Sequence, residues 1–487
     1  MGFFLLLGGV AGMGAATQDF RKAAAQALAD PALQKALLNV KHGFVAKRAA
    51  ARADLPEFDS LRHEARDIKD HTLGHLDLYL EAYERKVAES GGEVHYARDA
   101  AEARAIVLKL CEAARASLVT KGKSMVSEEI GLNAHLEAAG IEVVETDLGE
   151  YVAQARGERP SHIIAPIIHL NKESIERDFR NRHRHLPARR KLDRAEHLVA
   201  EARQVLREKF LSADVGITGA NFLIAETGSS VIVTNEGNGD LTATLPRTHI
   251  VIASIEKVVP TLEDAAVLVR LLARSATGQD ITTYTTFSTG VRRDGDPDGP
   301  SGYHVVLLDN GRSEMLGNEF ADMLRCIRCG ACLNHCPVYG AIGGHAYGSV
   351  YPGPMGAVLT PQLQGIDRAR DLPNASSFCG RCEAVCPLDI PLPGMMRAWR
   401  MRDFARGNPS LTERLALKLW SYAARRPRLY HALARIVVRR SARAAGAHGT
   451  VRRFPFLKAW TGARDLMAPE GETFHELYAK AKRKRTP

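Results

Sequence analysis

The stretch CIRCGACLNHCP, residues 326–337, places four cysteines within eleven residues and ends in a Cys-Pro pair. The spacing is C-x2-C-x2-C-x3-C-P, with the thiols at Cys326, Cys329, Cys332 and Cys336. In runs of this kind three thiolates bind one [4Fe–4S] cluster and the fourth serves a second cluster. Tetrahedral zinc more often takes two separated C-x2-C pairs. The spacing therefore predicts an iron–sulfur cluster and requires a second group of cysteines downstream.

The stretch CGRCEAVCP, residues 379–387, supplies that second group. The same crossed arrangement predicts that cluster 1 is held by Cys326, Cys329, Cys332 and Cys386, and cluster 2 by Cys336, Cys379 and Cys382. The alternatives are a zinc site or a set of buried thiols, and two runs that each end in Cys-Pro disfavour both. Disulfides are also disfavoured, because seven of the eight cysteines lie in these runs and the remaining Cys111 suits a reducing compartment.

The second run lacks one cysteine. A complete repeat would have a cysteine three residues before Cys379, and Ser376 stands there instead. Two interpretations stay open: a [4Fe–4S] cluster 2 with a fourth ligand from Ser376, solvent or a carboxylate, or a [3Fe–4S] cluster. The segments that flank the two runs have helical patterns, so we expect an α-helical two-cluster iron–sulfur domain over residues 311–400.

The C-terminal part of the chain is strongly basic. Residues 395–487 hold 22 Lys and Arg against 6 Asp and Glu, a formal charge of +16, and the rest of the chain carries about −6. We expect a basic helical region over 401–487, with Pro427 separating two helices and Leu415, Leu419 and Tyr422 on one stripe. Such a helix can lie on an anionic membrane surface. The alternative, which we favour, is packing on this protein or on another subunit.

The N-terminal end begins with an apolar stretch, residues 1–16. This stretch is too short to span a bilayer and lacks the positive start of a secretory signal. We expect an unstructured extension, which leaves the true start of the protein open. Residues 17–92 follow with apolar residues at helical spacing and end at Gly91-Gly92, so we expect a helical arm there.

Residues 93–310 alternate short apolar runs with helical patterns, which predicts an α/β domain with a largely parallel sheet. The expected strands are 93–97, 117–120, 141–146, 162–168, 229–235, 248–255 and 303–309. The expected helices are 99–114, 124–139, the charged stretch 172–210, and 262–276, while 282–290 is expected at a sheet edge. Ligands of parallel sheets lie beyond the carboxyl ends of the strands.

Two loops of this domain carry candidate ligand-binding residues. Lys121 and Lys123 precede a helix and are placed to receive an anion, although solvated lysines are the simpler interpretation. The GKS there is not a phosphate loop, because Ser117 replaces its first glycine. Glu226, Asn235 and Glu236 lie at the ends of apolar runs and predict a pocket wall, with a hairpin turn at Gly237 and Gly239 as the alternative.

No residue is assigned as a catalytic acid, base or nucleophile. The sequence has no G-x-S-x-G, no H-E-x-x-H and no dinucleotide-binding G-x-G-x-x-G after a strand. The basic run 177–197 lacks interleaved aromatic residues, so we expect no nucleic-acid partner.

These motifs occur in one order: TKGKSMVSEEIGLN, GITGANFLIAETGS and TNEGN, then CIRCGACLNHCPVY, IGGHAYGSVYPGPMGAVLTP and CGRCEAVCP. In that order they resemble the LutB-type iron–sulfur proteins of bacterial L-lactate utilisation. The resemblance implies a LUD domain, similar to sugar-isomerase and CoA-transferase folds, joined to a two-cluster ferredoxin-type module. It also implies LutA-like and LutC-like sister proteins that together oxidise L-lactate to pyruvate. The second run with three cysteines is similar to the family's own pattern, whereas the apolar extension departs from it.

The expected function is that of an electron-transfer subunit in an NAD-independent L-lactate dehydrogenase complex. It is expected in the cytoplasm, or at the inner face of the membrane, with a respiratory acceptor for its electrons. Two alternatives stay open. In the first, the LUD domain is the substrate-binding or catalytic element for a small carboxylate or phosphate. In the second, the chain is a redox sensor or scaffold with structural clusters.

Overall fold

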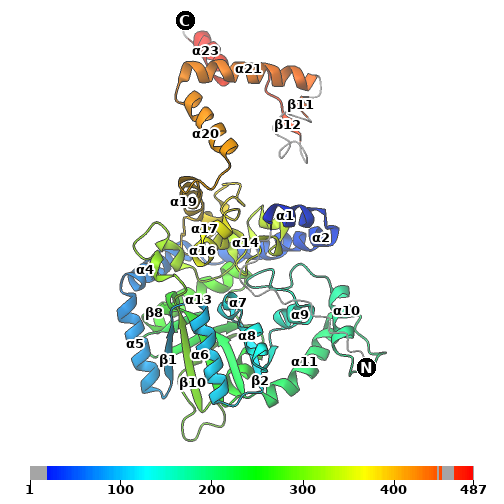
Figure 1. Ribbon diagram of the computed structural model, residues 1–487, viewed down its shortest axis with the longest axis vertical. Helices are drawn as coiled ribbons and strands as arrows, with labels where there is room; N and C mark the ends of the chain where they lie inside the picture. Colours follow the sequence, from blue (N-terminus) through cyan, green and yellow to red (C-terminus); the bar gives the residue numbers. More distant parts are fainter. Residues whose placement is uncertain (1–18, 447–448, 452–464, 486–487) are drawn as a thin grey trace. The chain divides into compact units, whose positions relative to one another are not determined.

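The computed structural model describes residues 19–446, 449–451 and 465–485. The chain divides into two compact units, Met1–Asp403 and Phe404–Pro487. Figure 1 shows the sheet, the helices around it and the cysteine-rich segment of the first unit. The apolar extension expected over residues 1–16 lies outside the described residues.

Helices form the N-terminal part of the first unit. Asp19 caps the first of them by accepting hydrogen bonds from two backbone N–H groups. Buried Phe58, Leu61 and Ala65 attach α4 to the rest of the unit, where it packs against α13. The elements are α1 (Phe20–Ala29), α2 (Pro31–Val40), the π-helical turn η1 (Lys41–Val45), α3 (Ala46–Ala53), α4 (Phe58–Gly74) and α5 (Leu76–Glu89).

A six-stranded parallel sheet forms the centre of the first unit, which confirms the predicted α/β architecture. Its order is β1-β10-β7-β4-β2-β3, and every neighbouring pair is parallel. The strands are β1 (Glu93–Ala97), β2 (Leu118–Gly122), β3 (Glu142–Glu145), β4 (Val215–Gly219), β7 (Thr248–Ser254) and β10 (Gly302–Leu308). Strands β7 and β10 have nearly continuous apolar runs, because they are buried on both faces.

Helices cover both faces of this sheet (Figure 1). Side chains such as Ile250 and Ile252 pack with α6, α7 and α8 on one face, whereas Val251 and Ala253 pack with α5 on the other. Gly131, with φ +67°, separates α7 from α8, so the single helix expected over 124–139 is two. The helices are α6 (Ala100–Ala113), α7 (Met125–Ile130), α8 (Leu132–Ala138), α9 (Leu148–Arg156), α10 (Lys172–Arg182), α11 (Ala195–Ser212), α12 (Asn238–Thr244) and α13 (Leu262–Ala276).

A smaller four-stranded sheet has the order β8-β5-β6-β9. Its strands are β5 (Phe222–Ile224), β6 (Ser229–Thr234), β8 (Val258–Val259) and β9 (Tyr284–Ser288). Strand β9 lies at the edge, as expected for residues 282–290. The alternative of a hairpin turn at Gly237 and Gly239 is wrong, because Gly237 precedes α12 and Gly239 lies within it.

The strand expected over residues 162–168 is absent, and the chain forms turns there. Pro166 has no backbone N–H to give to a neighbouring strand. Local hydrogen bonds satisfy the backbone instead: Ser161 N–H donates to the Pro166 carbonyl at 2.8 Å. The Nδ1 atom of buried His162 accepts from the N–H groups of Ile164 and Ala165 at 3.1 and 3.2 Å. This turn segment lies beside the cysteine-rich region, where Ile164 would meet a Cβ placed on Gly330 at 3.1 Å.

Short helices and connecting turns form the cysteine-rich segment. They are η3 (Ser313–Met315), η4 (Ala321–Arg325), α14 (Ala331–Asn334), α15 (Tyr339–Ile342), η5 (His345–Tyr347), α16 (Gly353–Gln364), α17 (Ile366–Ala369), α18 (Arg381–Ala384) and α19 (Leu392–Ala405). Helix α16 lies between the two cysteine runs in the sequence. It is almost wholly buried, so this connecting segment is part of the core.

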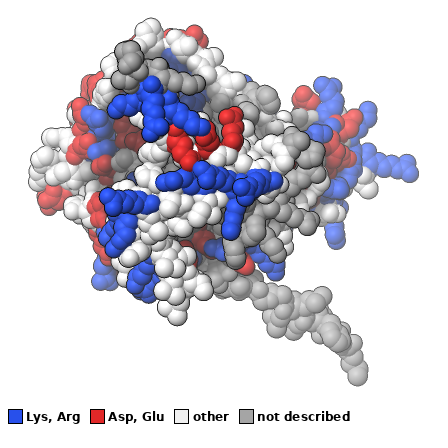
Figure 2. All heavy atoms as spheres, turned by 90° about the horizontal axis from the view of Figure 1, so that it is seen from above, with Lys and Arg blue, Asp and Glu red and all other residues white. Residues whose placement is uncertain are grey.

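The second unit contains α20 (Leu411–Ala424), α21 (Pro427–Ala445), the two-residue strands β11 (Thr450–Val451) and β12 (Leu466–Met467), and α23 (Phe474–Arg485). The break between α20 and α21 falls before Pro427, where it was expected. Figure 2 shows Lys and Arg side chains in several patches on one face of the molecule, with Asp and Glu among them. In the described part of the chain, no helix is both long and apolar enough to cross a membrane.

Candidate iron–sulfur site and the adjoining cavity

The two cysteine runs adopt the same backbone form. Arg328 and Phe378 both have positive φ, +60° and +54°, and each is followed two residues later by a left-handed glycine. Each glycine then begins a helix of one turn, α14 or α18. The Sγ atom of Cys326 accepts the N–H of Arg328 at 3.4 Å, and the Oγ atom of Ser376 accepts the N–H of Phe378 at 3.1 Å. Ser376 therefore occupies in the second run the position that Cys326 occupies in the first.

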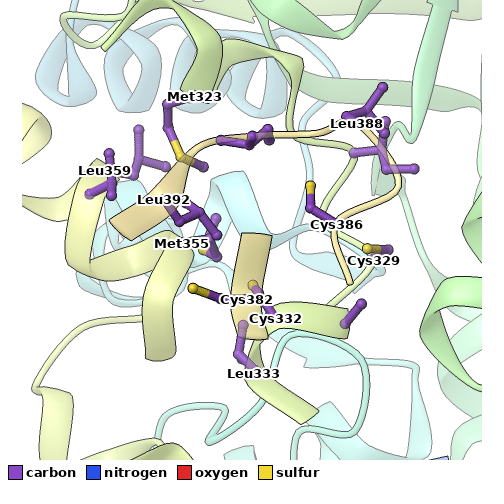
Figure 3. Packing of buried hydrophobic residues seen from close by; sticks show 14 of the residues in the cluster. Met323, Cys329, Cys332, Leu333, Met355, Leu359, Cys382, Cys386, Leu388 and Leu392 are labelled. Carbon is purple, nitrogen blue, oxygen red and sulfur yellow. The ribbon is translucent and has the colours of Figure 1, made fainter. Parts of the chain in front are cut away.

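One recess is lined by cysteines from both runs. Its thiols belong to Cys326, Cys329, Cys332 and Cys386, and its other walls include Met355, Leu388, Ile390 and Leu392. Figure 3 shows Cys386 beside Cys329 among these apolar side chains. The fold thus brings the last cysteine of the second run to the first three cysteines of the first run.

A second recess is lined by the other three cysteines of the runs. Its lining comprises Cys336, Cys379 and Cys382, with Ser376, Ser377, Phe378, Gly380, Arg381 and three prolines, Pro337, Pro354 and Pro393. Cys379 is exposed, whereas Cys336 and Cys382 are buried. This recess therefore has three thiols, one hydroxyl at the position of a fourth ligand, and an opening to solvent.

The donor set of both recesses fits iron–sulfur clusters. All seven cysteines are free thiols rather than disulfides. Burial, reinforced by neighbouring thiolates, raises the pKa of Cys329 to about 12 and that of Cys332 well above its usual value. Burial also raises the pKa of Cys382 to about 12. Thiolates in such places need a compensating positive charge, and a bound metal supplies it.

Arginines from the N-terminal helices hold the backbone of the second run. Arg48 of α3 is buried and donates to the Val385 carbonyl at 2.8 Å. Arg62 of α4 donates to the Cys386 carbonyl and also pairs with Asp389. Because these donors come from far upstream in the chain, the arm is part of the scaffold that positions Cys386.

A cavity of about 410 Å³ lies at the carboxyl ends of β2, β3, β4 and β7. It is lined by the loops that follow these strands, by the turn segment 163–167, by the end of α13, and by Lys257, Arg328 and Tyr351. Three of the candidate pocket residues, Lys123, Asn235 and Glu236, belong to this lining. The Lys123 ammonium pairs with Asp147 and lies 3.2 Å from a Glu236 carboxylate oxygen.

The other two candidate pocket residues do not line this cavity. Lys121 is buried, with its ammonium 2.8 Å from Glu128 and 2.7 Å from Glu145. Burial lowers the pKa of Lys121, but these carboxylates outweigh burial and raise that pKa above its usual value. Glu226 accepts the N–H of Leu262 at 3.2 Å, at the start of α13. Both residues therefore serve local charge pairing and helix capping.

Buried charges under the cavity escaped the sequence analysis. Arg312 is fully buried between Glu129, at 2.6 Å, and Glu256, at 3.2 Å. Arg328 lies 3.2 Å from Glu256, and its guanidinium carbon lies 4.4 Å from the centre of the Tyr351 ring. Although burial favours the neutral form, the arginines lower the pKa of Glu256 to about 2.

One of these buried groups is a lysine. Burial and the nearby Arg328 lower the pKa of Lys257 to about 7. The signal for this group was the charged pair Glu256-Lys257 within the apolar run SIEKVVP, residues 254–260. Charged residues are rarely buried without partners, so such a pair inside a strand-like run marks a special environment.

Comparison with known proteins gives a consistent assignment along the chain. The LUD domain family matches residues 80–308, the 4Fe-4S dicluster domain family matches 322–390, and the family described as lactate utilisation protein B, C-terminal, matches 383–483.

Full-length relatives agree with these matches. "Lactate utilization protein B" of Shouchella clausii is 43% identical over 96% of this chain and 97% of its own length. The "Uncharacterized electron transport protein YkgF" of Escherichia coli is 42% identical over 95% and 96%. A Geobacillus "Lactate utilization protein B" is 44% identical over 89% and 90%. With a dicluster domain at the cysteine runs and this identity over nearly the whole chain, the protein belongs to the lactate utilisation protein B family.

Proposed function

We propose that this iron–sulfur protein is the electron-transfer subunit of a complex that oxidises L-lactate to pyruvate without NAD. The observation that carries the proposal is the arrangement of seven free cysteines in two recesses within one compact unit. Membership of the lactate utilisation protein B family supports the substrate. Oxidation of lactate releases two electrons, and two one-electron centres within one chain match that number.

The proposed ligands of cluster 1 are Cys326, Cys329, Cys332 and Cys386, and those of cluster 2 are Cys336, Cys379 and Cys382. Shared recess linings support this crossed assignment. When bound, the clusters supply one-electron transfer at potentials set by hydrogen bonds to the ligand atoms and by solvent exposure. The N–H of Arg328 donates to Cys326, and apolar side chains exclude water from the first recess.

We propose a [4Fe–4S] cluster in each recess, where the hydroxyl of Ser376 would serve as the fourth ligand of cluster 2. The matching backbone positions of Cys326 and Ser376 support this placement. A hydroxyl is a weaker ligand for iron than a thiolate in this environment, so the same site readily becomes [3Fe–4S] by loss of one iron. The exposure of Cys379 gives oxidants access to the second recess.

The proposed partners are LutA-like and LutC-like proteins, with a respiratory acceptor for the electrons. The second unit offers a surface for such contacts. Helix α20 has no buried residue, and Leu415, Leu419 and Trp420 are 59%, 70% and 65% exposed. Apolar side chains left exposed together on a helix mark an interaction surface. The positive charge of this region also suits an acidic partner or an anionic membrane surface.

Lactate titration of the anaerobically purified complex tests the proposed function. Electron paramagnetic resonance should show reduction of both clusters by L-lactate when the LutA-like and LutC-like proteins are present. The protein alone, with intact clusters that dithionite reduces, is the matched control. Clusters that dithionite reduces but lactate never reduces in the assembled complex would contradict electron transfer and favour a structural or sensory role.

A further inference from the structure

The cavity at the carboxyl ends of β2, β3, β4 and β7 adjoins the first cysteine recess. Among the residues that the structure describes, Arg328 alone belongs to the linings of both. We propose that this cavity binds a small organic carboxylate, with the side chains of Arg328 and Lys257 receiving the carboxylate group. The inference rests on the proposed function, because it places the substrate class of a lactate-utilisation protein at a defined site in this chain.

The first argument is the incomplete hydrogen bonding of Arg328. Its side chain is 9% exposed, and one guanidinium nitrogen, Nη2, donates to Glu256 at 3.2 Å. The Nε and Nη1 atoms are buried and have no partner among the described residues. Leaving charged donors buried and unsatisfied is unfavourable, because they lose their hydrogen bonds to water and gain none in return. An anion in the cavity would accept from these donors.

The second argument is the local excess of positive charge. Four basic side chains, Arg312, Arg328, Lys69 and Lys257, lie near Glu256, and Arg312 also pairs with Glu129. Lys69 is held by the carbonyl oxygens of Glu256 and Val258 and is turned to the backbone. The Lys257 ammonium forms no hydrogen bond or ion pair with the residues that the structure describes, and it lines the cavity. A carboxylate bound at this wall would give the Lys257 ammonium a partner.

The third argument concerns the remaining walls, which favour an organic anion over inorganic phosphate. Apolar side chains, among them Ile164, Ile252, Leu272 and Ala276, form part of the lining. At the opposite wall the Lys123 ammonium is already paired with two carboxylates, Asp147 and Glu236. A largely apolar pocket with a few convergent polar groups is typical of small-molecule sites. One charged end and a short apolar body match these walls.

The fourth argument is the connection to the first cysteine recess. The main-chain N–H of Arg328 donates to the sulfur of Cys326, while its side chain lines the cavity. Gly330, two residues further on, has φ +71° and lies so close to Ile164 and His162 that a Cβ there would meet them at 3.1 and 3.3 Å. Arg328 is next to Cys329 and two positions from Cys326 in the chain, so a carboxylate bound to its side chain would lie beside two of the proposed ligands of cluster 1.

Calorimetric titration of the cluster-loaded, oxidised, full-length protein tests the proposal, with pyruvate as the probe because it cannot donate electrons by the proposed reaction. The variants are Arg328→Gln and Lys257→Met. Arg400→Gln is the matched control, since Arg400 stacks over Phe378 and donates to the Pro373 carbonyl at 2.9 Å beside the second run, outside the cavity lining. Iron content and the resonance spectra of both clusters verify that each variant is loaded.

We expect pyruvate to bind the wild type and the control equally, and about tenfold or more weakly to each cavity variant, as loss of a charged hydrogen bond predicts. Pyruvate should also shift the resonance of reduced cluster 1 and leave that of cluster 2 unchanged. If Arg328→Gln fails to load cluster 1, Lys257→Met carries the test, because Lys257 lies outside the cysteine runs.

Three results would overturn the inference: equal pyruvate affinity in all variants, no pyruvate binding to the loaded wild type, or tighter binding of inorganic phosphate than of pyruvate. Each of them leaves the electron-transfer proposal intact if lactate still reduces the clusters in the complex. Conversely, pyruvate could bind the wild type and bind the cavity variants more weakly, while lactate never reduces the clusters in the complex. That outcome would refute electron transfer and still support the carboxylate site.

Discussion

The guanidinium of Arg62, in α4, donates two hydrogen bonds to the carbonyl oxygen of Cys386, from Nε at 3.0 Å and from Nη2 at 2.8 Å. The two residues are 324 positions apart in the chain. Arg62 is only 14% exposed at this contact, so water competes poorly for the carbonyl. Cys386, the cysteine of the second run that lines the first recess, is thus held in place by the N-terminal helices.

Replacing Arg62 by glutamine should loosen Cys386 and destabilise the first recess. Loss of charge-assisted hydrogen bonds at a largely buried site should lower the free energy of unfolding by about 1.5–3 kcal/mol. Chemical denaturation under anaerobic conditions measures it, and cluster 1 should also be lost sooner in air. Arg270→Gln is the control, because its ion pair with Glu57 is nearly half exposed and should contribute about 0–1 kcal/mol. Equal losses for the two variants would contradict a special role of Arg62.

Substitution of single cysteines tests the crossed ligand sets. Cys386→Ser should damage cluster 1 although it belongs to the second run, and Cys336→Ser should damage cluster 2 although it belongs to the first. Resonance spectra of the reduced proteins distinguish the two clusters. Cys111→Ser, which removes a buried thiol outside both recesses, should leave both spectra unchanged. Loss of cluster 2 in Cys386→Ser, with cluster 1 intact, would show that the ligands are not crossed.

Mild oxidation should convert cluster 2 to the [3Fe–4S] form before cluster 1 reacts. The reason is that the second recess has three thiols and a hydroxyl, and its Cys379 is exposed. Ser376→Cys should protect the cluster, because its sulfur would take the position that Cys326 has in the first run. Ser377→Cys, one residue along, is the control and should protect less. Equal resistance of the two wild-type clusters would mean that another group holds the fourth iron firmly.

Acid should destabilise the fold through His249. This histidine is buried, and its Nε2 atom shares a hydrogen bond of 2.8 Å with the hydroxyl of Thr218. Burial lowers the pKa of His249 to about 3, below the value near 6.5 that the unfolded chain has. The unfolded chain therefore binds the proton first, and stability falls as the pH drops below about 6.5 toward 3. In His249→Gln the free energy of unfolding should therefore fall less than in the wild type as the pH is lowered from about 7 to about 5.

Removal of residues 411–487 should weaken assembly with the sister proteins while both clusters load normally. The exposed apolar residues of α20 and the positive charge of the tail supply the contacts that are lost. Binding of the full-length protein should weaken with salt, since exposed charges are screened over about 10 Å at 0.1 M ionic strength. Co-purification measures assembly, and sedimentation with anionic liposomes measures the alternative. A truncated protein that still assembles but no longer binds liposomes would assign the tail to the membrane surface.

The sequence predicted the parallel sheet and the iron–sulfur domain because both have local signatures. Apolar runs alternate with amphipathic helices, and cysteine spacing is set within a few residues. The prediction for 162–168 was wrong, because apolar composition outweighed Pro166, and the backbone of that segment bonds to itself.

The candidate pocket was predicted only in part, for a related reason. Lys123, Asn235 and Glu236 follow strands of known direction, so their meeting at one cavity could be anticipated. Arg328 and Tyr351 line the same cavity but belong to the cysteine-rich segment. No local sequence pattern predicts a contact between segments so far apart in the chain. Lys121 shows the opposite limit: it lies within strand β2 rather than in a loop, and its ammonium is buried beside carboxylates such as Glu145.

The placement of Cys386 has a consequence for biosynthesis. A ribosome makes Cys326, Cys329 and Cys332 well before it makes Cys386, and the other recess receives Cys336 from the first run but Cys379 and Cys382 from the second. The first recess has its full lining only after Leu392 has been made, and the second only after Pro393. Metal loading thus requires the finished iron–sulfur segment. By then α4 has already been synthesised, and Arg62 is available to donate to the carbonyl oxygen of Cys386. A chain that stops early would carry two half-built sites rather than one complete site.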